Sequence, residues 1–490
     1  MSDPSQIQVP IGQALTSDMM LGLKPSAPKS RSYRLSLPAL NKATFTGGDS
    51  MIFEIPCGRK GSWLDQSQSY LKFSVQCQTN GACTIGGTGI YLENSAYGFI
   101  QRLDVLNSSN TLESINEYGQ LANFLIDTSL TRSDKYGMSP LIGTNSVLRT
   151  STTTVAAASD NVITTYGGDR SGQSLASETT YAASIPYTFS LPVLSGIIGI
   201  NASKMLPIGQ LMAPIRCEFI LASNDDAIYY GSAGAGATWQ LINVELCCCF
   251  VEIQDDSLSP QLQQGEQEYI STMTYKQSST FLPKASSGEV TCLIPFRCAS
   301  LSAIYARFRN QTGAVQGANA TAGYRKSSSV NPNFAQAYFR IGGSMYPPKP
   351  INLISSSSGT GSEGYAELMK SFHALGSASC NGSIGFSQYN VASTATKGWN
   401  ACATTVAKSG TVVDTYANAF AIGLELQSFS NRNDTIMSGV STLNSQIYFT
   451  GTTYGANLTG GTGTSDMTID FFGLMDMILV IENGIMSAKY

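Results

Sequence analysis

The chain carries the same short series of structural signals twice. Residues 48–56 and 288–295 each combine a turn glycine, a short apolar stretch typical of a strand and a closing Ile-Pro pair. Further along each half, a helical segment carries Tyr-x-x-Leu, at Tyr118 and again at Tyr365. The two markers recur in the same order at nearly the same spacing, which is far longer than a solenoid repeat. The sequence therefore predicts a duplicated all-β domain with one helix in each copy.

The surface of the protein must be unusually poor in charge. The 490 residues leave room for two or three domains with proper cores. Charged residues make up only 13%, about half the usual share, so Ser, Thr, Asn, Gln and Gly must cover much of the exterior. Such a neutral surface suits a protein that contacts copies of itself better than a solitary enzyme kept soluble by charge.

The charge distribution gives no sign of strong nucleic-acid binding. The formal net charge is −4, so no global field attracts phosphate. Residues 24–34 hold four cations without an acid, namely Lys24, Lys29, Arg31 and Arg34. Because four cations neutralise few phosphates, we interpret this segment as a solvated or subunit-docking arm.

Targeting and cysteine patterns favour a protein that is not secreted. Residues 1–30 form a polar, proline-containing arm without the apolar core of a secretory signal. The longest apolar run, residues 471–481, is interrupted by Asp476 and is too short for a membrane helix. Eleven cysteines include no Cys-x-x-Cys pair, and the consecutive residues 247–249 must alternate between strand faces. We expect buried free thiols in a reducing cell.

Residues 31–253 read as the first domain. Strand patterns cover residues 33–37, 51–55, 71–75, 99–106, 187–191, 215–221 and 242–250. Ser114 to Glu117 match a capping box, which predicts a helix with Ile115, Tyr118 and Ile126 on its apolar face. Residues 130–183 then turn rich in Ser, Thr, Ala and Gly, which is typical of a surface insertion.

A polar linker, residues 254–267, leads to the second domain, residues 268–490. A helix is expected over residues 363–375, followed by a second insertion over residues 376–418. Three prolines in residues 347–350 read as the end of a strand. The strands are expected over residues 269–275, 290–294, 304–308, 337–341, 420–426, 446–450 and 467–481. Both halves thus predict strands, a helix, a long polar insertion and further strands.

Catalytic residues are hard to nominate. His373, the single histidine, falls in the second expected helix, and no Gly-x-Ser-x-Gly elbow offers it a nucleophile. The acid pairs at 225–226 and 255–256 are sequence neighbours, whereas a glycosidase needs two acids that face each other across a cleft. We predict no enzymatic activity and interpret His373 as a structural or surface residue.

Cofactor and metal sites are equally unsupported. The sequence has no P-loop and no dinucleotide fingerprint, and the glycine clusters at 231–236 and 460–463 read as turns. We predict no cofactor and no catalytic, cofactor-binding or metal-binding residue. Exposed aromatic residues could bind glycans, but strand aromatics mostly fill sheet interiors. Core packing is therefore the preferred interpretation for Tyr338, Phe339, Tyr346, Phe449 and Phe471.

Three segments resemble a known family. They are residues 97–105 with the helix that follows, residues 331–347, and the terminal residues 477–484. Over residues 32–490 the chain resembles the double jelly-roll major capsid proteins of tailless icosahedral DNA viruses. This lineage includes adenovirus hexons, virophages, polinton-like viruses and the nucleocytoplasmic large DNA viruses.

The resemblance implies two tandem antiparallel eight-stranded jelly-roll β-sandwiches, each with a short helix and a long surface insertion. It implies a structural protein whose homotrimers form pseudo-hexagonal capsomers of an icosahedral shell, with the insertions as outer towers. Implied partners are neighbouring capsomers, penton and minor capsid proteins, and a host receptor at the outer loops. The implied location is the virion, after synthesis in the host cytoplasm or nucleus.

Two alternatives stay open at this point. One is a capsid protein with a single jelly roll and a separate projection domain. The other is a non-viral β-sandwich adhesin or glycan-binding protein, for which a secretory signal or a disulfide pattern would be expected. Whether the two halves share one topology decides between the first alternative and the duplicated fold.

Overall fold

The computed structural model describes most of both halves of the chain. The described residues are 29–79, 90–130, 132–144, 150–154, 161–166, 171–202, 204–230, 236–253, 268–283, 286–310, 329, 332, 334–353, 362–373, 389, 403–406, 420–428, 437–453 and 466–490. The expected linker, nearly all of the N-terminal arm and most of the second insertion lie outside them.

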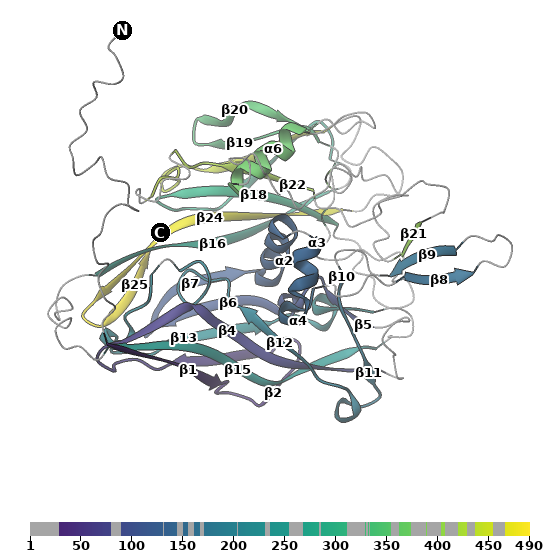
Figure 1. The fold of residues 1–490 in the computed structure, drawn as a ribbon. Coiled ribbons are helices and arrows are strands. Elements are labelled where there is room, and N and C mark those ends of the chain that lie inside the picture. The colour runs from purple at the N-terminus through teal and green to yellow at the C-terminus, as the bar shows by residue number, and fades with distance from the viewer. Residues whose placement is uncertain are drawn as a thin grey trace, which may run out of the picture.

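The first half forms a sandwich of two antiparallel sheets (Figure 1). One sheet has the order β1 (Ser30–Pro38), β15 (Thr238–Ile253), β4 (Ser62–Gln78) and β12 (Tyr187–Pro192). The facing sheet has the order β3 (Ser50–Ile55), β13 (Ile215–Leu221), β6 (Ile100–Asn107) and β7 (Asn110–Asn116).

The second half repeats this arrangement. One sheet has the order β16 (Glu268–Leu282), β24 (Met467–Glu482), β18 (Leu301–Asn310) and β22 (Ala421–Glu425). The facing sheet has the order β17 (Glu289–Ile294), β23 (Ile447–Thr453), β19 (Phe334–Ile341) and β20 (Ser344–Asn352).

Both halves therefore share one connectivity. Of the eight sandwich strands in chain order, the first, eighth, third and sixth form one sheet, and the second, seventh, fourth and fifth form the other. This is the jelly-roll topology. The prediction of two tandem eight-stranded jelly rolls is confirmed, and a single roll with an unrelated projection domain is excluded.

Alternation along the strands follows from burial. In β13 the apolar side chains of Ile215, Cys217 and Phe219 are buried, whereas Arg216 is exposed and Glu218 half-buried. Such alternation is expected when one face of a sheet meets the core and the other meets solvent. β24 behaves differently, because thirteen of its sixteen residues are buried and both of its faces are covered. Burial on both faces explains the apolar run that the sequence shows over residues 471–481.

A helix follows the fifth sandwich strand in each half. These helices are α2 (Tyr118–Ser129) and α6 (Ser362–Ser371). The capping-box prediction was wrong, because Ser114 and Ile115 belong to β7 and pair with β6. Glu117 precedes the helix with a left-handed φ of 48° and makes no side-chain cap. The backbone N–H and C=O groups of this segment form ladder hydrogen bonds with β6, so they are not available for a helix cap.

The strand β20 was missed because of its prolines. The sequence reading took Pro347, Pro348 and Pro350 as the end of a strand, yet all three lie within Ser344–Asn352. Among the described strands, β20 pairs with β19 alone and lies at the edge of its sheet, and its register shifts between the pairs of Ala337 and Phe339. An edge position tolerates proline because half of the backbone N–H groups need no partner strand.

The first insertion contains more regular structure than its composition predicted. It holds α3 (Arg132–Gly137), α4 (Ser139–Ile142), β8 (Thr150–Thr154), β9 (Asn161–Tyr166), β10 (Ser171–Leu175), β11 (Ser177–Glu178) and the 3-10 helix η3 (Tyr181–Ala183). β9 pairs with β21 (Ala403–Val406) of the second insertion, so both insertions contribute to one sheet. Figure 1 shows this sheet at the end of the molecule opposite β25 (Ile485–Lys489).

Smaller elements complete the fold. They are β2 (Thr44–Phe45), β5 (Ile90–Glu93), η2 (Ala96–Phe99), η4 (Ile208–Gln210), α5 (Asn224–Ala227) and β14 (Ile228–Tyr230). Among the described helices, none has both the length and the apolar character that a membrane crossing requires. The boundaries of the arm, linker and insertions stay predictions.

The start of α2 depends on a glycine. A Cβ atom at Gly119 would lie 2.4 Å from the carbonyl oxygen of Tyr97 and 2.8 Å from that of Ile100. We expect Gly119→Ala to destabilise the protein by about 1–3 kcal/mol, because backbone atoms cannot move aside cheaply. Thermal unfolding measures the effect. Gly137→Ala in α3 is the matched control, since nothing lies within 4 Å of its added Cβ, and equal losses for both variants would contradict the prediction.

Candidate functional site: the seam between the sandwiches

The two sandwiches meet along a continuous contact that we call the seam. From the first half, β7, α2 and residues 193–201 contribute to it, and from the second half the outward face of the β16-β24-β18 sheet. In β18, Ile304 and Phe308 point into the second core, whereas Tyr305 and Arg307 contact the first half. The seam is thus built on rigid strands and a helix.

A carboxylate is buried in the seam without an ionic partner among its hydrogen bonds. Glu113 of β7 is 0% exposed. Its carboxylate accepts hydrogen bonds from the Ser195 hydroxyl, from Thr274 Oγ1 at 2.5 Å and from the Gly196 N–H at 3.1 Å. Burial raises the pKa of Glu113, and these three donors only partly oppose that effect. Thr274 belongs to the second half, so this group fixes the two sandwiches to each other.

An aromatic cluster lies beside this polar group. The ring centroid of Phe124 in α2 lies 5.6 Å from Tyr305, 5.9 Å from Phe472 and 6.0 Å from Phe372. Tyr305 and Phe372 stack with centroids 4.8 Å apart. One first-half side chain therefore inserts among three aromatic rings of the second half. Such pairs contribute about 0.5–1.5 kcal/mol each beyond the area they bury.

A buried arginine spans the seam next to the cluster. Arg307 is 1% exposed, and its Nη1 donates to Gln120 Oε1 of α2 at 3.1 Å. On the same strand, Arg309 Nε donates to Asp470 Oδ2 at 2.6 Å. Asp470 also accepts from Ser279 Oγ at 2.7 Å. Removing one member of such a buried set leaves a charge unpaired, which costs far more than the intact set contributes.

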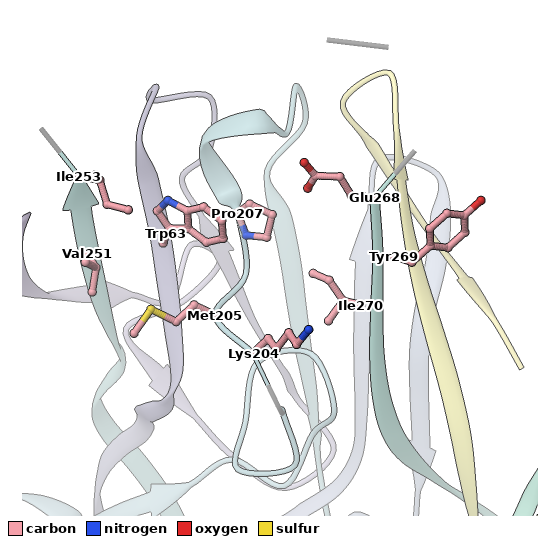
Figure 2. Close-up of a pocket in the computed structure, with 9 residues that line it drawn as sticks. All are labelled: Trp63, Lys204, Met205, Pro207, Val251, Ile253, Glu268, Tyr269 and Ile270. Carbon is pink, nitrogen blue, oxygen red and sulfur yellow. The ribbon is translucent and has the colours of Figure 1, made fainter. Parts of the chain in front are cut away.

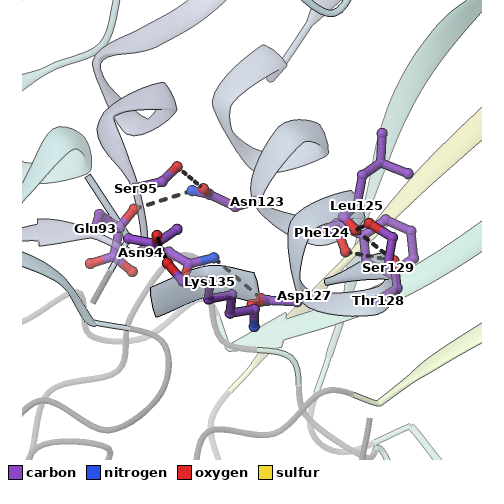
Figure 3. A network of polar contacts seen from close by, with 11 residues as sticks. Glu93, Asn94, Ser95, Asn123, Phe124, Leu125, Asp127, Thr128, Ser129 and Lys135 are labelled. Carbon is purple, nitrogen blue, oxygen red and sulfur yellow. Dashed lines mark hydrogen bonds and ion pairs between the residues drawn. The ribbon is translucent and has the colours of Figure 1, made fainter. Parts of the chain in front are cut away.

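A polar network holds α2 in place from the opposite side (Figure 3). Asn123 Nδ2 donates to the Glu93 carbonyl at 3.1 Å, and Ser95 Oγ donates to Asn123 Oδ1 at 2.5 Å. Lys135 Nζ of α3 lies 2.8 Å from Asp127 Oδ1 in a mostly buried ion pair. The first insertion thereby supports the helix that carries Gln120 and Phe124 into the seam.

The C-terminal strand closes the seam at its other end. Met486 N–H of β25 donates to Asn107 Oδ1 at 2.9 Å, and Asn110 Nδ2 donates to the Met486 carbonyl at 3.3 Å. The hydroxyl of Tyr490 donates to the Leu112 carbonyl. The end of the second half thus binds the edge of a first-half sheet.

A surface pocket opens at this end of the molecule, between the two halves (Figure 2). Its volume is about 500 Å³, and its lining is mainly apolar. Trp63, Met205, Pro207, Val251 and Ile253 face it from the first half, Glu268 and Ile270 face it from β16, and Lys204 and Tyr269 lie at its margin. Paired hydrogen bonds between Leu64 and Leu206 hold the loop with Met205 against β4. We call this cavity the base pocket.

The outer face of the β17-β23-β19-β20 sheet carries a cross-strand row of larger side chains. Leu293 pairs with Tyr448, which pairs with Arg340. The Arg340 guanidinium lies 5.0 Å from the centroid of the Tyr448 ring. Leu293 is 48% exposed. Tyr and Arg are enriched at protein–protein interfaces, and Leu293 adds an exposed apolar side chain to this row.

His373 lies outside the helix in which it was expected. α6 ends at Ser371, and His373 follows in a turn with a φ of 55°. Its Nδ1 lies 3.6 Å from Glu425 Oε1, which is longer than a hydrogen bond. Because the side chain is 42% exposed at the rim of the fold, its position fits the expected structural or surface role.

The cysteines are free thiols, as predicted, in the part of the chain that the structure describes. Cys248 packs inward, whereas Cys247 Sγ lies 3.4 Å from Ser36 Oγ on the other face of β15. Burial raises the pKa of Cys77 and of Cys248 to about 12. Protonated thiols of this kind are poor nucleophiles and poor metal ligands.

The remaining candidates do not converge on a chemical centre. Phe339, Phe449 and Phe471 are buried in the second core, as predicted, and Tyr338 and Tyr346 are half-buried. The acid pair at 225–226 lies on α5, and the pair at 255–256 lies outside the described residues. Within the described ranges, no three His, Cys, Asp or Glu residues gather as metal ligands would.

Sequence reasoning missed the seam residues. Glu113 was overlooked because it falls between the strand expected over residues 99–106 and the capping motif at residues 114–117, and one acidic residue in a polar stretch gives no signal of burial. The sequence did indicate that Arg307 and Asp470 are buried and paired, since each interrupts a strand of large apolar residues. Charges in such strands are paired when both sheet faces are covered.

The buried carboxylate predicts a pH-dependent stability. Because the folded state raises the pKa of Glu113 above its ordinary value of 4.5, the folded state binds the proton more tightly than the unfolded chain does. The contribution of Glu113 to the free energy of unfolding therefore decreases as the pH rises from its ordinary pKa through its raised pKa. We expect Glu113→Gln to lose this dependence and to gain in relative thermal stability between pH 4 and pH 8. A wild-type advantage that grows with pH would contradict the assignment.

Comparisons with known proteins agree with the topology. Neither a family model nor a curated protein sequence matches the chain. Solved structures match over nearly its whole length. The Faustovirus major capsid protein aligns with a TM-score of 0.59 and 9% identity, covering 95% of this chain and 93% of its own.

Two further structures give similar values. PBCV-1 VP54, fitted into a reconstruction of the virophage Sputnik, aligns with a TM-score of 0.55 and 13% identity, covering 96% of this chain and 98% of its own. The mavirus major capsid protein aligns with a TM-score of 0.52 and 10% identity, covering 99% of this chain and 95% of its own. The chain therefore has the double jelly-roll fold of the major capsid proteins of icosahedral viruses.

Proposed function

We propose that this chain is the major capsid protein of an icosahedral DNA virus. The observation that carries the proposal is the match of both sandwiches, in tandem, to capsid proteins that are themselves covered almost completely. A fold alone does not fix a function. The charge-poor exterior supports the same conclusion, because a shell subunit must contact other subunits over much of its surface.

In this proposal three copies form a capsomer, and their six sandwiches give it a pseudo-hexagonal outline. The seam supports this role, because it holds the two sandwiches of one copy at a fixed angle. The exposed row of Leu293, Tyr448 and Arg340 is our candidate for a lateral contact between copies. Contacts around a threefold axis are heterologous, so this row would meet a different surface on the neighbour.

The two ends of the molecule would serve different sides of the shell. The sheet of β8, β9 and β21 joins both insertions and lies at the end of the molecule opposite β25 (Figure 1). We assign the insertions to the outer surface, where they would meet a host receptor, and the base pocket to the inner surface. Penton and minor capsid proteins are the further partners, and the virion is the location.

An enzymatic role and strong nucleic-acid binding have no support in this proposal. Arg31 and Arg34 of the basic segment belong to β1, and Arg34 Nη1 donates to Tyr70 Oη at 2.7 Å instead of standing free. The adhesin alternative is weaker, because the eight described cysteines are unpaired, whereas small secreted modules commonly rely on disulfides.

Assembly of the purified protein tests the proposal. Mass photometry and negative-stain microscopy should show particles of three 52.0 kDa chains, with a hexagonal outline. We expect Leu293→Asp to weaken association at least about tenfold, since burying an unpaired charge at a contact costs more than 1.4 kcal/mol.

The control for this variant is Leu40→Asp, at a residue that is 60% exposed in a loop of the first sandwich. It should assemble as the wild type does. Wild-type chains that stay monomeric at high concentration would overturn the capsid proposal. Normal trimers of the Leu293→Asp variant would overturn only the assigned contact row.

A further inference from the structure

The base pocket is a preformed apolar cavity that is separate from the hydrogen bonds and aromatic contacts of the seam. Trp63 and Met205 face Ile270 across it, from opposite halves of the chain (Figure 2). Met205 is 43% exposed, although its neighbours Leu206 and Ile208 are buried. An exposed apolar cavity of about 500 Å³ is large enough for several side chains of a peptide.

The N-terminal segment begins at the wall of this pocket. β1 starts at Ser30, which pairs with Ile253 at the end of β15, and Ile253 lines the pocket. Residues 1–28 lie outside the described part of the chain, so 28 residues extend from this point. A fully extended chain spans about 3.3–3.6 Å per residue, so even six residues can cross a cavity of this size.

The sequence of this segment matches the chemistry of the pocket. Residues 19–23 read Met-Met-Leu-Gly-Leu and contain no charge. Methionine and leucine fill irregular apolar cavities well, because their flexible side chains adapt to the available space. Lys24 and Lys29, on the side toward β1, are charged and would stay in solvent, near the carboxylate of Glu268, which lines the pocket.

We propose that residues 1–28 of the chain bind in its own base pocket, with residues 19–23 against Trp63, Met205 and Ile270. The occupant is the same chain rather than another copy, because a short tether gives an effective concentration in the millimolar range. The inference does not depend on assembly into a shell, since the pocket lies within one chain.

Photo-crosslinking in the full-length protein tests this site. A benzophenone amino acid placed at Met20 should form crosslinks with pocket residues, which mass spectrometry locates. We expect Met205→Glu to reduce these crosslinks at least about tenfold, because a carboxylate would have to be buried in an apolar cavity. Met212→Glu is the matched control, since Met212 is 72% exposed in the same loop region but does not line the pocket.

Each outcome decides the proposal. Crosslinks to the pocket that survive Met212→Glu and disappear with Met205→Glu support it. Crosslinks that map elsewhere, or that are equally lost in both variants, overturn it. A mixture of isotope-labelled and unlabelled chains identifies the occupant, and crosslinked peptides that combine both labels would show that a neighbouring copy supplies the segment and would refute docking within one chain.

Discussion

The burial of two neighbouring strands, β18 and β24, on both faces of their sheet is the constraint on which this structure depends. The β16-β24-β18 sheet packs against its partner sheet within the second sandwich and against β7 and α2 of the first. A sheet with an apolar outer face is not stable in water on its own, because that face must be covered. The first sandwich therefore covers the outward face of this sheet, and we expect the two halves to unfold together.

The polar groups of the seam define how the two halves fit. Apolar contacts around Phe124 favour association but tolerate sliding, whereas Glu113 and Arg307 find their partners in only one register. Their burial is costly unless every hydrogen bond is made. We infer that these groups contribute more to the fixed angle between the sandwiches than to the free energy of folding. A fixed angle is what a subunit needs if six sandwiches are to close around a threefold axis.

Much of the fold could be predicted from the sequence, and the failures have physical reasons. Strands with one covered face, such as β13, were located because their residues alternate, and the duplication followed from the order of the elements. β20 was lost because prolines usually end strands, yet the edge of a sheet admits them. β7 was missed because a local capping motif competed with pairing to β6, and the sequence does not show that partner.

The seam could not be predicted from the sequence, because tertiary packing decides which surfaces of the two halves meet. The shared sheet of the two insertions depends on pairing over more than 200 residues, and a Ser- and Thr-rich composition gives no register.

We propose that two similar sandwiches, joined by a buried seam, form one rigid building block that associates around a threefold axis. Electron cryomicroscopy of the purified particle tests it most directly. We expect a threefold particle with six sandwiches, in which continuous density joins Phe124 and the side chains of the β16-β24-β18 sheet within each copy. A particle of a single chain, or sandwiches that take variable angles with solvent between them, would contradict it.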